Sequence, residues 1–202
     1  MEANLEEPIT ENHAPEPTQP SSRTWVRFLL DVMETVLLAA ILFLVINAIS
    51  ARVRVEGHSM DQSLQDGEFV LVNRLAYRFG TPQRGDIIVF HHPTDQTQED
   101  LIKRVIGLPG DDVRVADGGV YVNGIRLKES YITPDRAPAY TDERVVPDGE
   151  LYVLGDNRNN SSDSHQWGFV VNKDVIGRAI LIYWPLERVS FLQHVDLVKA
   201  SQ

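Results

Sequence analysis

Lys103 stands where a lysine side chain can act as a base. In the run Leu101–Gly107, the alternation of a strand puts Leu101, Lys103 and Val105 on one face. A lysine between two aliphatic side chains is desolvated, which disfavours the ammonium form and lowers its pKa. A neutral amine can then accept the proton of a serine hydroxyl. The same pattern also allows a charged lysine that extends into solvent from an edge strand.

Ser59 is the candidate nucleophile for such a base. It lies two residues after Gly57 and follows the alternating run Arg52–Val55. Glycine at that position permits a tight turn and backbone angles that are closed to other residues. A Gly-x-Ser sequence occurs in many ordinary turns, so the spacing alone does not establish a nucleophile.

A third polar segment, residues 155–164, offers groups that can support this pair. It reads Gly-Asp-Asn-Arg-Asn-Asn-Ser-Ser-Asp-Ser and directly follows the apolar run Leu151–Leu154. Glycine, acid, amide and hydroxyl residues after a strand are typical of a loop that carries side chains to a site.

Together these segments resemble the type I signal peptidases. That family has a Ser-Met pair after a membrane segment and then a Gly-Asp-Ile/Val strand. Lys-Arg-Val-x-Gly-x-Pro-Gly-Asp follows, and Gly-Asp-Asn-x-x-x-Ser-x-Asp-Ser comes last. This chain has all four in that order, beginning at Ser59, Gly85, Lys103 and Gly155. Each motif alone is common, but the ordered set is specific and covers about residues 29–184.

The resemblance implies how the catalytic residues act. Ser59 is expected to be the nucleophile, and Lys103 the general base and later the general acid. Ser161 matches the family serine that hydrogen-bonds to the lysine amine and orients it. The backbone N–H of Ser59 is expected to receive the oxyanion. Some relatives add a serine hydroxyl where Gly57 stands, so that donor is absent here.

The resemblance also implies two supporting interactions. Asp163 is expected to brace its loop, and Arg104 and Asp156 to form an ion pair between their segments. Arginine is usual in the family where His165 stands, so an Asp163–His165 brace would be weaker and would depend on pH. Proline is usual where Gln62 stands, and its loss removes a fixed φ and adds an N–H. We expect that change to loosen the substrate-binding edge.

The activity implied is that of a membrane-bound serine endopeptidase that cleaves signal peptides from translocated preproteins after an Ala-x-Ala-like site. The substrate is expected to add as a strand beside Val53–Ser59 and Leu101–Lys103. Backbone pairing would give affinity, and shallow pockets would select small residues. The residues expected to contact substrate are Val53, Val55, Met60, Leu64, Leu101 and Ile102.

A transmembrane anchor is predicted at residues 25–50. The 22 residues of Phe28–Ile49 are strongly apolar and would span roughly 33 Å as a helix, enough for a bilayer core of about 30 Å. A buried helix of a soluble protein is an alternative. A cleavable signal peptide is another, because Ala48-Ile49-Ser50 offers small residues before Ala51. The long acidic leader favours an uncleaved anchor, although trimming near Ala48–Ser50 stays open.

Residues 1–24 are expected to form a disordered tail. They contain five glutamates and one arginine and almost no large apolar residues. Arginines flank the apolar segment on both sides, so charge bias gives no orientation. The resemblance implies a single-pass protein of the cytoplasmic membrane, with the N-terminus in the cytoplasm and the catalytic domain on the outer face.

The remainder, residues 51–202, is predicted to be a mainly β domain of antiparallel, coiled sheets. Turn signals separate its short runs, and Asn123-Gly124 suits a two-residue hairpin. No convincing helix follows the anchor, and residues 186–202 are ambiguous. The predicted strands are 52–55, 68–73, 86–90, 101–107, 113–115, 120–122, 150–154 and 179–184.

Composition excludes several other functions. The net charge of −10 and the lack of a basic stripe argue against nucleic acid. The chain has no cysteine, and its six histidines show no metal-ligand spacing, so we expect neither a metal nor another cofactor. The expected partners are secretory preproteins, the lipid bilayer and the protein translocation machinery.

Two other functions compete with this interpretation. A self-cleaving repressor of the SOS type shares the serine–lysine dyad, but it needs a helix-turn-helix domain and this chain has an apolar segment instead. A catalytically silent relative that binds preproteins or a membrane partner is motivated by Gln62 and His165. Retention of Ser59, Lys103 and Ser161 argues against it.

Overall fold

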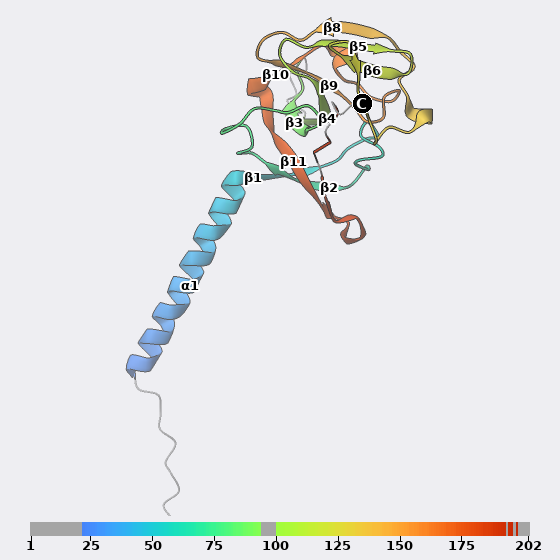
Figure 1. Cartoon of the computed structure of the whole chain (residues 1–202). Helices are drawn as coiled ribbons and strands as arrows, with labels where there is room; N and C mark the ends of the chain where they lie inside the picture. Colours follow the sequence, from blue (N-terminus) through green and yellow to red (C-terminus); the bar gives the residue numbers. More distant parts are fainter. Residues whose placement is uncertain (1–21, 94–99, 193, 196, 198–202) are drawn as a thin grey trace, which may run out of the picture. The chain divides into compact units, whose positions relative to one another are not determined.

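The structure is a computed structural model that describes residues 22–93, 100–192, 194, 195 and 197 (Figure 1). Contacts divide the chain into two compact units, Met1–Leu44 and Val45–Gln202. The tail expected at residues 1–24 lies outside the described residues up to residue 21.

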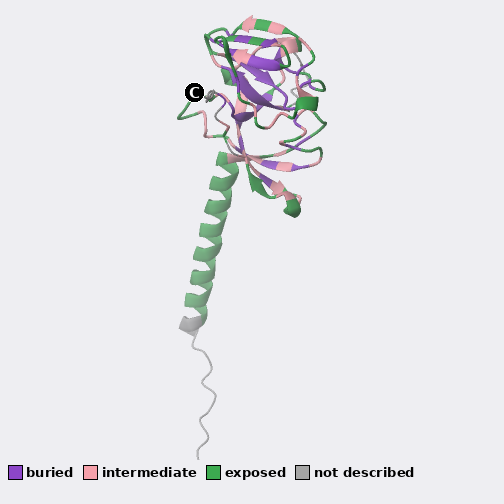
Figure 2. Ribbon diagram, turned by 45° about the vertical axis from the view of Figure 1, so that its right-hand side comes forward, coloured by how far each residue is buried: buried purple, intermediate pink, exposed green. Residues whose placement is uncertain are grey.

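The segment predicted to be an anchor is one long helix, α1, Ser22–Ile49. Within the described residues it is the one helix long and apolar enough to cross a membrane, over Trp25–Ile49, with a mean hydropathy of 2.5. Its residues from Trp25 to Ile49 are exposed (Figure 2). The Thr35 hydroxyl donates to the Asp31 carbonyl at 2.8 Å, so this polar group is satisfied within the helix.

The second unit is mainly β, as predicted. Its elements are β1 (Ser50–Arg54), β2 (Phe69–Asn73), β3 (Ile87–His91), β4 (Asp100–Gly107), β5 (Asp112–Ala116), β6 (Gly119–Val122), β7 (Ile125–Arg126), η1 (Pro134–Arg136), β8 (Asp142–Val145), β9 (Glu150–Leu154), α2 (Ser164–Trp167), β10 (Val170–Val171), η2 (Asn172–Asp174), β11 (Val175–Trp184), η3 (Leu186–Arg188) and β12 (Ser190–Phe191).

These strands form two antiparallel sheets. The larger sheet has the order β1-β2-β11-β3-β4-β9-β10, and β12 pairs with β11. The smaller sheet has the order β7-β6-β5-β8. In Figure 1, β5, β6 and β8 lie at the opposite end of this unit from β1 and β2. Buried residues concentrate in the strands of the unit (Figure 2).

Strand β4 holds the core together, because its side chains reach three hydrophobic clusters. Ile102 packs in the cluster that contains Val55 and Met60. Ile106 belongs to the cluster beneath the smaller sheet, and Val105 to a third cluster with Phe90. A strand buried on both faces gives a fixed platform for the charged residues that it also carries.

The hairpin prediction at Asn123-Gly124 is confirmed. Both residues have positive φ, 53° and 78°, and they join Val122 to Ile125 as a two-residue loop. The predicted strands are present with ends shifted by a few residues. Four strands were not predicted: β7, β10 and β12 have two residues each, and β8 carries charged side chains. The ambiguous segment 186–202 supplies η3 and β12 in its described part.

Candidate active site

Two free strand edges border a groove in the β unit. Among the described residues, strand β1 pairs only with β2, so its other edge is open there. Strand β4 joins β9 only from Arg104 onward, which leaves the edge of Asp100–Lys103 without a strand partner in the described part of the chain. The groove between them has a volume of about 430 Å³ and is lined by Arg52, Val53, Arg54, Glu56, Ser59, Asp100, Leu101, Ile102 and Lys103.

Ser59 and Lys103 meet in this groove. The Lys103 amine donates to the Ser59 hydroxyl oxygen at 2.7 Å and to the carbonyl of Ile102 at 3.1 Å. Lys103 is only 3% exposed, which excludes the alternative of a lysine extended into solvent. Burial lowers its pKa to about 8, against the charges of Asp163 and Asp156, which raise it. The lysine is therefore close to neutral at mildly alkaline pH.

The turn that carries Ser59 is fixed by the loop that follows β9. The backbone N–H of Asn157 donates to the Ser59 carbonyl at 2.9 Å, and its side-chain amide donates to the His58 carbonyl at 3.0 Å. Gly57 has a φ of +82°, a value that disfavours other residues, and its N–H donates to Asp66. These bonds hold the hydroxyl of Ser59 toward Lys103.

Gly155 is a point of close approach between this loop and Ser59. A Cβ at this position would lie 2.5 Å from the Ser59 carbonyl oxygen and 2.2 Å from the Ser161 hydroxyl oxygen. Only glycine leaves room for both. Any larger residue here would displace the backbone of the candidate nucleophile.

Ser161 lies beside the pair without joining it. Its hydroxyl is buried and has no hydrogen-bond partner among the described residues, and the Lys103 amine donates to Ser59 and Ile102 instead. The contact implied by the family resemblance is therefore absent from this arrangement. The hydroxyl can nevertheless still donate or accept a hydrogen bond next to the amine.

Asp163 braces the loop from within. One carboxylate oxygen accepts the Gly155 N–H at 2.9 Å. The other lies 2.6 Å from Nδ1 of His165 and accepts its backbone N–H, which caps the N-terminus of α2. The His165 ring stacks on Tyr140 at 4.1 Å between ring centroids. The structure thus places His165 beside Asp163, as expected.

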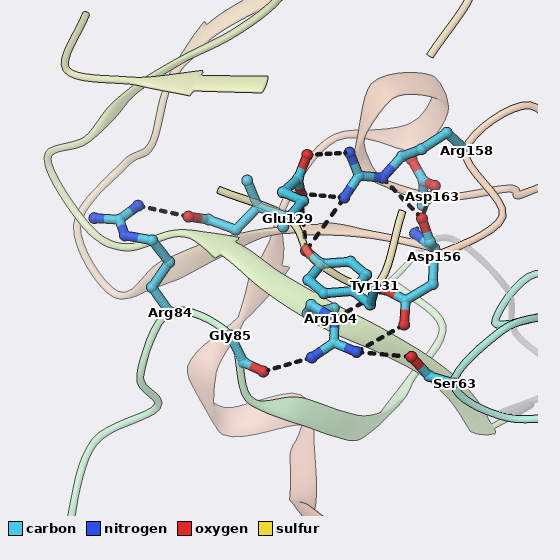
Figure 3. A network of polar contacts seen from close by, with 11 residues as sticks. Ser63, Arg84, Gly85, Arg104, Glu129, Tyr131, Asp156, Arg158 and Asp163 are labelled. Carbon is cyan, nitrogen blue, oxygen red and sulfur yellow. Dashed lines mark hydrogen bonds and ion pairs between the residues drawn. The ribbon is translucent and has the colours of Figure 1, made fainter. Parts of the chain in front are cut away.

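Arg104 and Asp156 form the expected ion pair (Figure 3). The guanidinium donates to both carboxylate oxygens, at 2.9 and 2.7 Å. It also donates to the Gly85 carbonyl at 2.9 Å and to the Ser63 hydroxyl at 3.0 Å. One arginine therefore links the lysine strand, the turn after Ser59 and the polar loop.

A second buried pair, between Arg158 and Glu129, was not predicted. Arg158 is fully buried and donates to both carboxylate oxygens of Glu129 and to the Gly155 carbonyl. Tyr131 donates its hydroxyl to Glu129, and its ring lies against the guanidinium of Arg104, 3.9 Å from the ring centroid. Figure 3 shows the two pairs joined through this tyrosine. No sequence pattern marks Glu129 or Tyr131 as a partner.

The six expected substrate contacts divide into two groups. Val53, Leu101 and Ile102 line the groove. Val55, Met60 and Leu64 are instead buried in the core, at most 2% exposed. The chain turns inward after β1, so these three side chains pack in the same cluster as Ile102 and not on the groove surface.

Gln62, where the family usually has proline, adopts a φ of +98°. Its amide donates to the Thr133 hydroxyl at 2.8 Å. Proline fixes φ near −65°, so this conformation is closed to it.

Within the described part of the chain, no three side chains of metal-binding type lie close enough to hold an ion.

Comparisons with known proteins identify the family of this chain. Residues 27–184 match the family model described as signal peptidase, peptidase S26. A probable signal peptidase I-2 of Synechocystis is 43% identical over 86% of this chain and 79% of its own length. Signal peptidase I of Leptolyngbya laminosa is 42% identical over 81% of this chain and 84% of its own length. Signal peptidase I of Bacillus caldolyticus is 40% identical over 68% of this chain and 81% of its own length. The chain therefore belongs to the type I signal peptidases of peptidase family S26, which are serine peptidases.

Proposed function

We propose that this chain is a membrane-anchored endopeptidase that cleaves signal peptides from translocated preproteins with Ser59 and Lys103. One observation carries the proposal: the buried Lys103 amine lies 2.7 Å from the Ser59 hydroxyl oxygen. In a groove between two free strand edges, this pair stands where an added peptide strand would pass.

Acylation begins when the neutral amine of Lys103 accepts the Ser59 proton. The Ser59 oxygen attacks the scissile carbonyl, and we expect the backbone N–H of Ser59 to donate to the oxyanion. The Lys103 ammonium then gives its proton to the leaving amine, which departs as the mature protein's new N-terminus. The signal peptide remains as an ester on Ser59.

Deacylation uses the same lysine in its neutral form. Lys103 accepts a proton from a water molecule, and the hydroxide formed attacks the ester carbonyl. The protonated lysine returns its proton to the Ser59 oxygen as the signal peptide leaves. The buried hydroxyl of Ser161, which has no partner in the described part of the chain, can hydrogen-bond to the amine or the water when substrate occupies the groove.

Selection of small residues follows from the shape of the groove. Val53, Leu101 and Ile102 are aliphatic side chains that line it beside the two strand edges. An extended substrate turns alternate side chains toward this surface. We infer that it accepts small residues at the position before the cut and two residues earlier, an Ala-x-Ala-like pattern.

The apolar helix sets the place of the reaction. We infer that α1 crosses the cytoplasmic membrane once, with the N-terminus in the cytoplasm and the β unit on the outer face, where preproteins emerge. Contact with the translocation machinery is part of the same proposal.

Cleavage of a preprotein with an Ala-x-Ala site tests this function. The full chain, Ser59→Ala and Lys103→Ala are compared in detergent, and mass spectrometry locates the cut. We expect cleavage after the second small residue by the wild type and at least a thousandfold loss in each variant. Folded wild-type protein that cuts no preprotein would favour the silent binding relative. Cleavage that survives both substitutions would mean that other residues do the chemistry.

A further inference from the structure

A second cavity of the β unit lies beside the end of α1 and shares no lining residue with the catalytic groove. It has a volume of about 460 Å³, within the range of small-ligand sites. Its lining includes Ala48, from the last turn of α1, and the turn after β2. The backbone N–H of Arg74 donates to the Ile49 carbonyl at 3.0 Å, which fixes this turn to the helix end.

Three cationic side chains converge on this cavity from two segments. Arg74 and Arg78 come from the turn after β2, and Lys173 comes from η2. All three are exposed, and none makes a side-chain hydrogen bond or ion pair within the described residues. In a chain with 29 acidic and 19 basic residues, three neighbouring cations without a carboxylate partner are unexpected.

The remaining groups of the cavity do not neutralise these charges. Among the described residues of the lining, Asp174 is the one carboxylate. His91 is already bound to Asp100 at 2.8 Å, and the Tyr77 hydroxyl donates to Asp86. The cavity therefore keeps an excess of positive charge, with two guanidinium forks and one ammonium as free donors.

We propose that this cavity binds a phosphate group with net negative charge, presented by an anionic phospholipid headgroup. Guanidinium groups match phosphate oxygens in pairs, and a lysine adds a mobile point charge. Ala48, in the last turn of the apolar helix, lines the cavity, and β1 follows the helix directly, so the site lies at the end of the apolar segment. Phe79, next to Arg78, is 88% exposed and offers a ring to the acyl boundary of the same lipid.

Bound in this way, the lipid would seat the β unit at the membrane surface. The cavity adjoins the Ser50 end of β1, since Asn73 pairs with Ser50 and Arg74 follows it. The catalytic groove runs along the other end of the same strand, from Arg52 to Arg54. A lipid bound at Arg74 would thus set the distance between the membrane surface and the free edge of β1, where a substrate leaving the bilayer would bind.

Native mass spectrometry of the full chain in detergent tests the site. The added probes are phosphatidylglycerol, phosphatidylcholine with the same acyl chains, and glycerol phosphate. We expect one phosphatidylglycerol molecule to stay bound per chain, and we expect phosphatidylcholine and glycerol phosphate not to stay bound. In Arg74→Gln/Arg78→Gln/Lys173→Gln, each lost cation should weaken binding about fivefold, roughly a hundredfold together.

A matched control removes three exposed cations from the smaller sheet and its continuation, Arg114→Gln/Arg126→Gln/Lys128→Gln. It makes the same change in net charge and should retain the lipid. Unfolding temperatures in detergent check that both variants fold, and Lys173→Glu alone gives a milder second variant. Equal retention of phosphatidylglycerol by the first variant, or of phosphatidylcholine by the wild type, would overturn the proposal. Equal binding of glycerol phosphate would keep the phosphate site but overturn its lipid source.

Discussion

Arg104 and Asp156 form a bidentate ion pair that is almost wholly excluded from water. The two side chains are 2% and 0% exposed, and two hydrogen bonds of 2.9 and 2.7 Å join them. Arg104 adjoins Lys103 in the chain, and Asp156 adjoins Gly155, which contacts Ser59. The pair therefore fixes the lysine strand and the polar loop against each other.

Breaking this pair should destabilise the fold strongly. Asp156→Ala leaves the Arg104 guanidinium buried without its counter-charge, which typically costs about 3–5 kcal/mol. Denaturant unfolding of the full chain in detergent measures the loss. Asp135→Ala, which removes the exposed partner of Arg136, should leave stability unchanged. Similar results for both substitutions would show that the buried pair does not hold the loop.

The pH dependence of cleavage should report the lysine. Because Lys103 must be neutral to accept the Ser59 proton, kcat/KM should rise with pH and level off above its pKa of about 8. Initial rates with a signal-peptide substrate between pH 6 and 10 give the curve. A rate that does not change across pH 7–9, with the protein folded throughout, would contradict a titrating lysine base.

The same lysine should cost stability at neutral pH. Its folded pKa of about 8 lies below the ordinary value of 10.5, so the unfolded chain binds the proton more tightly. Below pH 8 the full cost of about 3 kcal/mol applies, and it falls to nothing as pH rises from 8 to 10.5. Lys103→Met should therefore raise the free energy of unfolding at pH 7.

The check on Lys103→Met is a pair of unfolding curves at pH 7 and pH 10. The wild type should gain stability relative to the variant between these values. Lys128→Met, an exposed lysine in the same unit, serves as the control and should show no such gain. If Lys103→Met were less stable than the wild type at pH 7, burial would not be the cause of the lowered pKa.

Substitution of Gln62 by glycine and by proline should change the stability of the protein in opposite directions. At a φ of +98°, a side chain is strained, so Gln62→Gly should stabilise by about 1 kcal/mol despite the loss of the bond to Thr133. Gln62→Pro cannot adopt this angle and should destabilise the turn after Ser59. Thermal unfolding of both variants measures the difference. A stabilising proline would mean that the turn has another conformation.

Local pattern was enough to predict the larger part of the fold. Period-two alternation identified the long strands, and the Asn123-Gly124 pair identified a hairpin, because both signals act within a few residues. Strands β7, β10 and β12 could not be found in this way. With two residues each, they exist because a partner strand is already in place.

The residues of the candidate site that lie in the ordered family motifs could be predicted from the sequence. The resemblance pointed to Ser59, Lys103, Asp163 and the Arg104–Asp156 pair, and the structure brings all of them together. It did not separate groove residues from core residues, since both are aliphatic. Pairing of Arg158 with Glu129 depends on a contact across 29 residues of chain, and no local signal specifies it.

Alkylation of a single introduced cysteine tests the central claim most directly. The chain contains no cysteine, so Ser59→Cys creates its one thiol, at the position of the proposed nucleophile. This variant should cleave a preprotein slowly, and N-ethylmaleimide should abolish that cleavage while leaving the wild type untouched. If the fully alkylated variant still cleaved the preprotein at its original rate, Ser59 would not be the nucleophile.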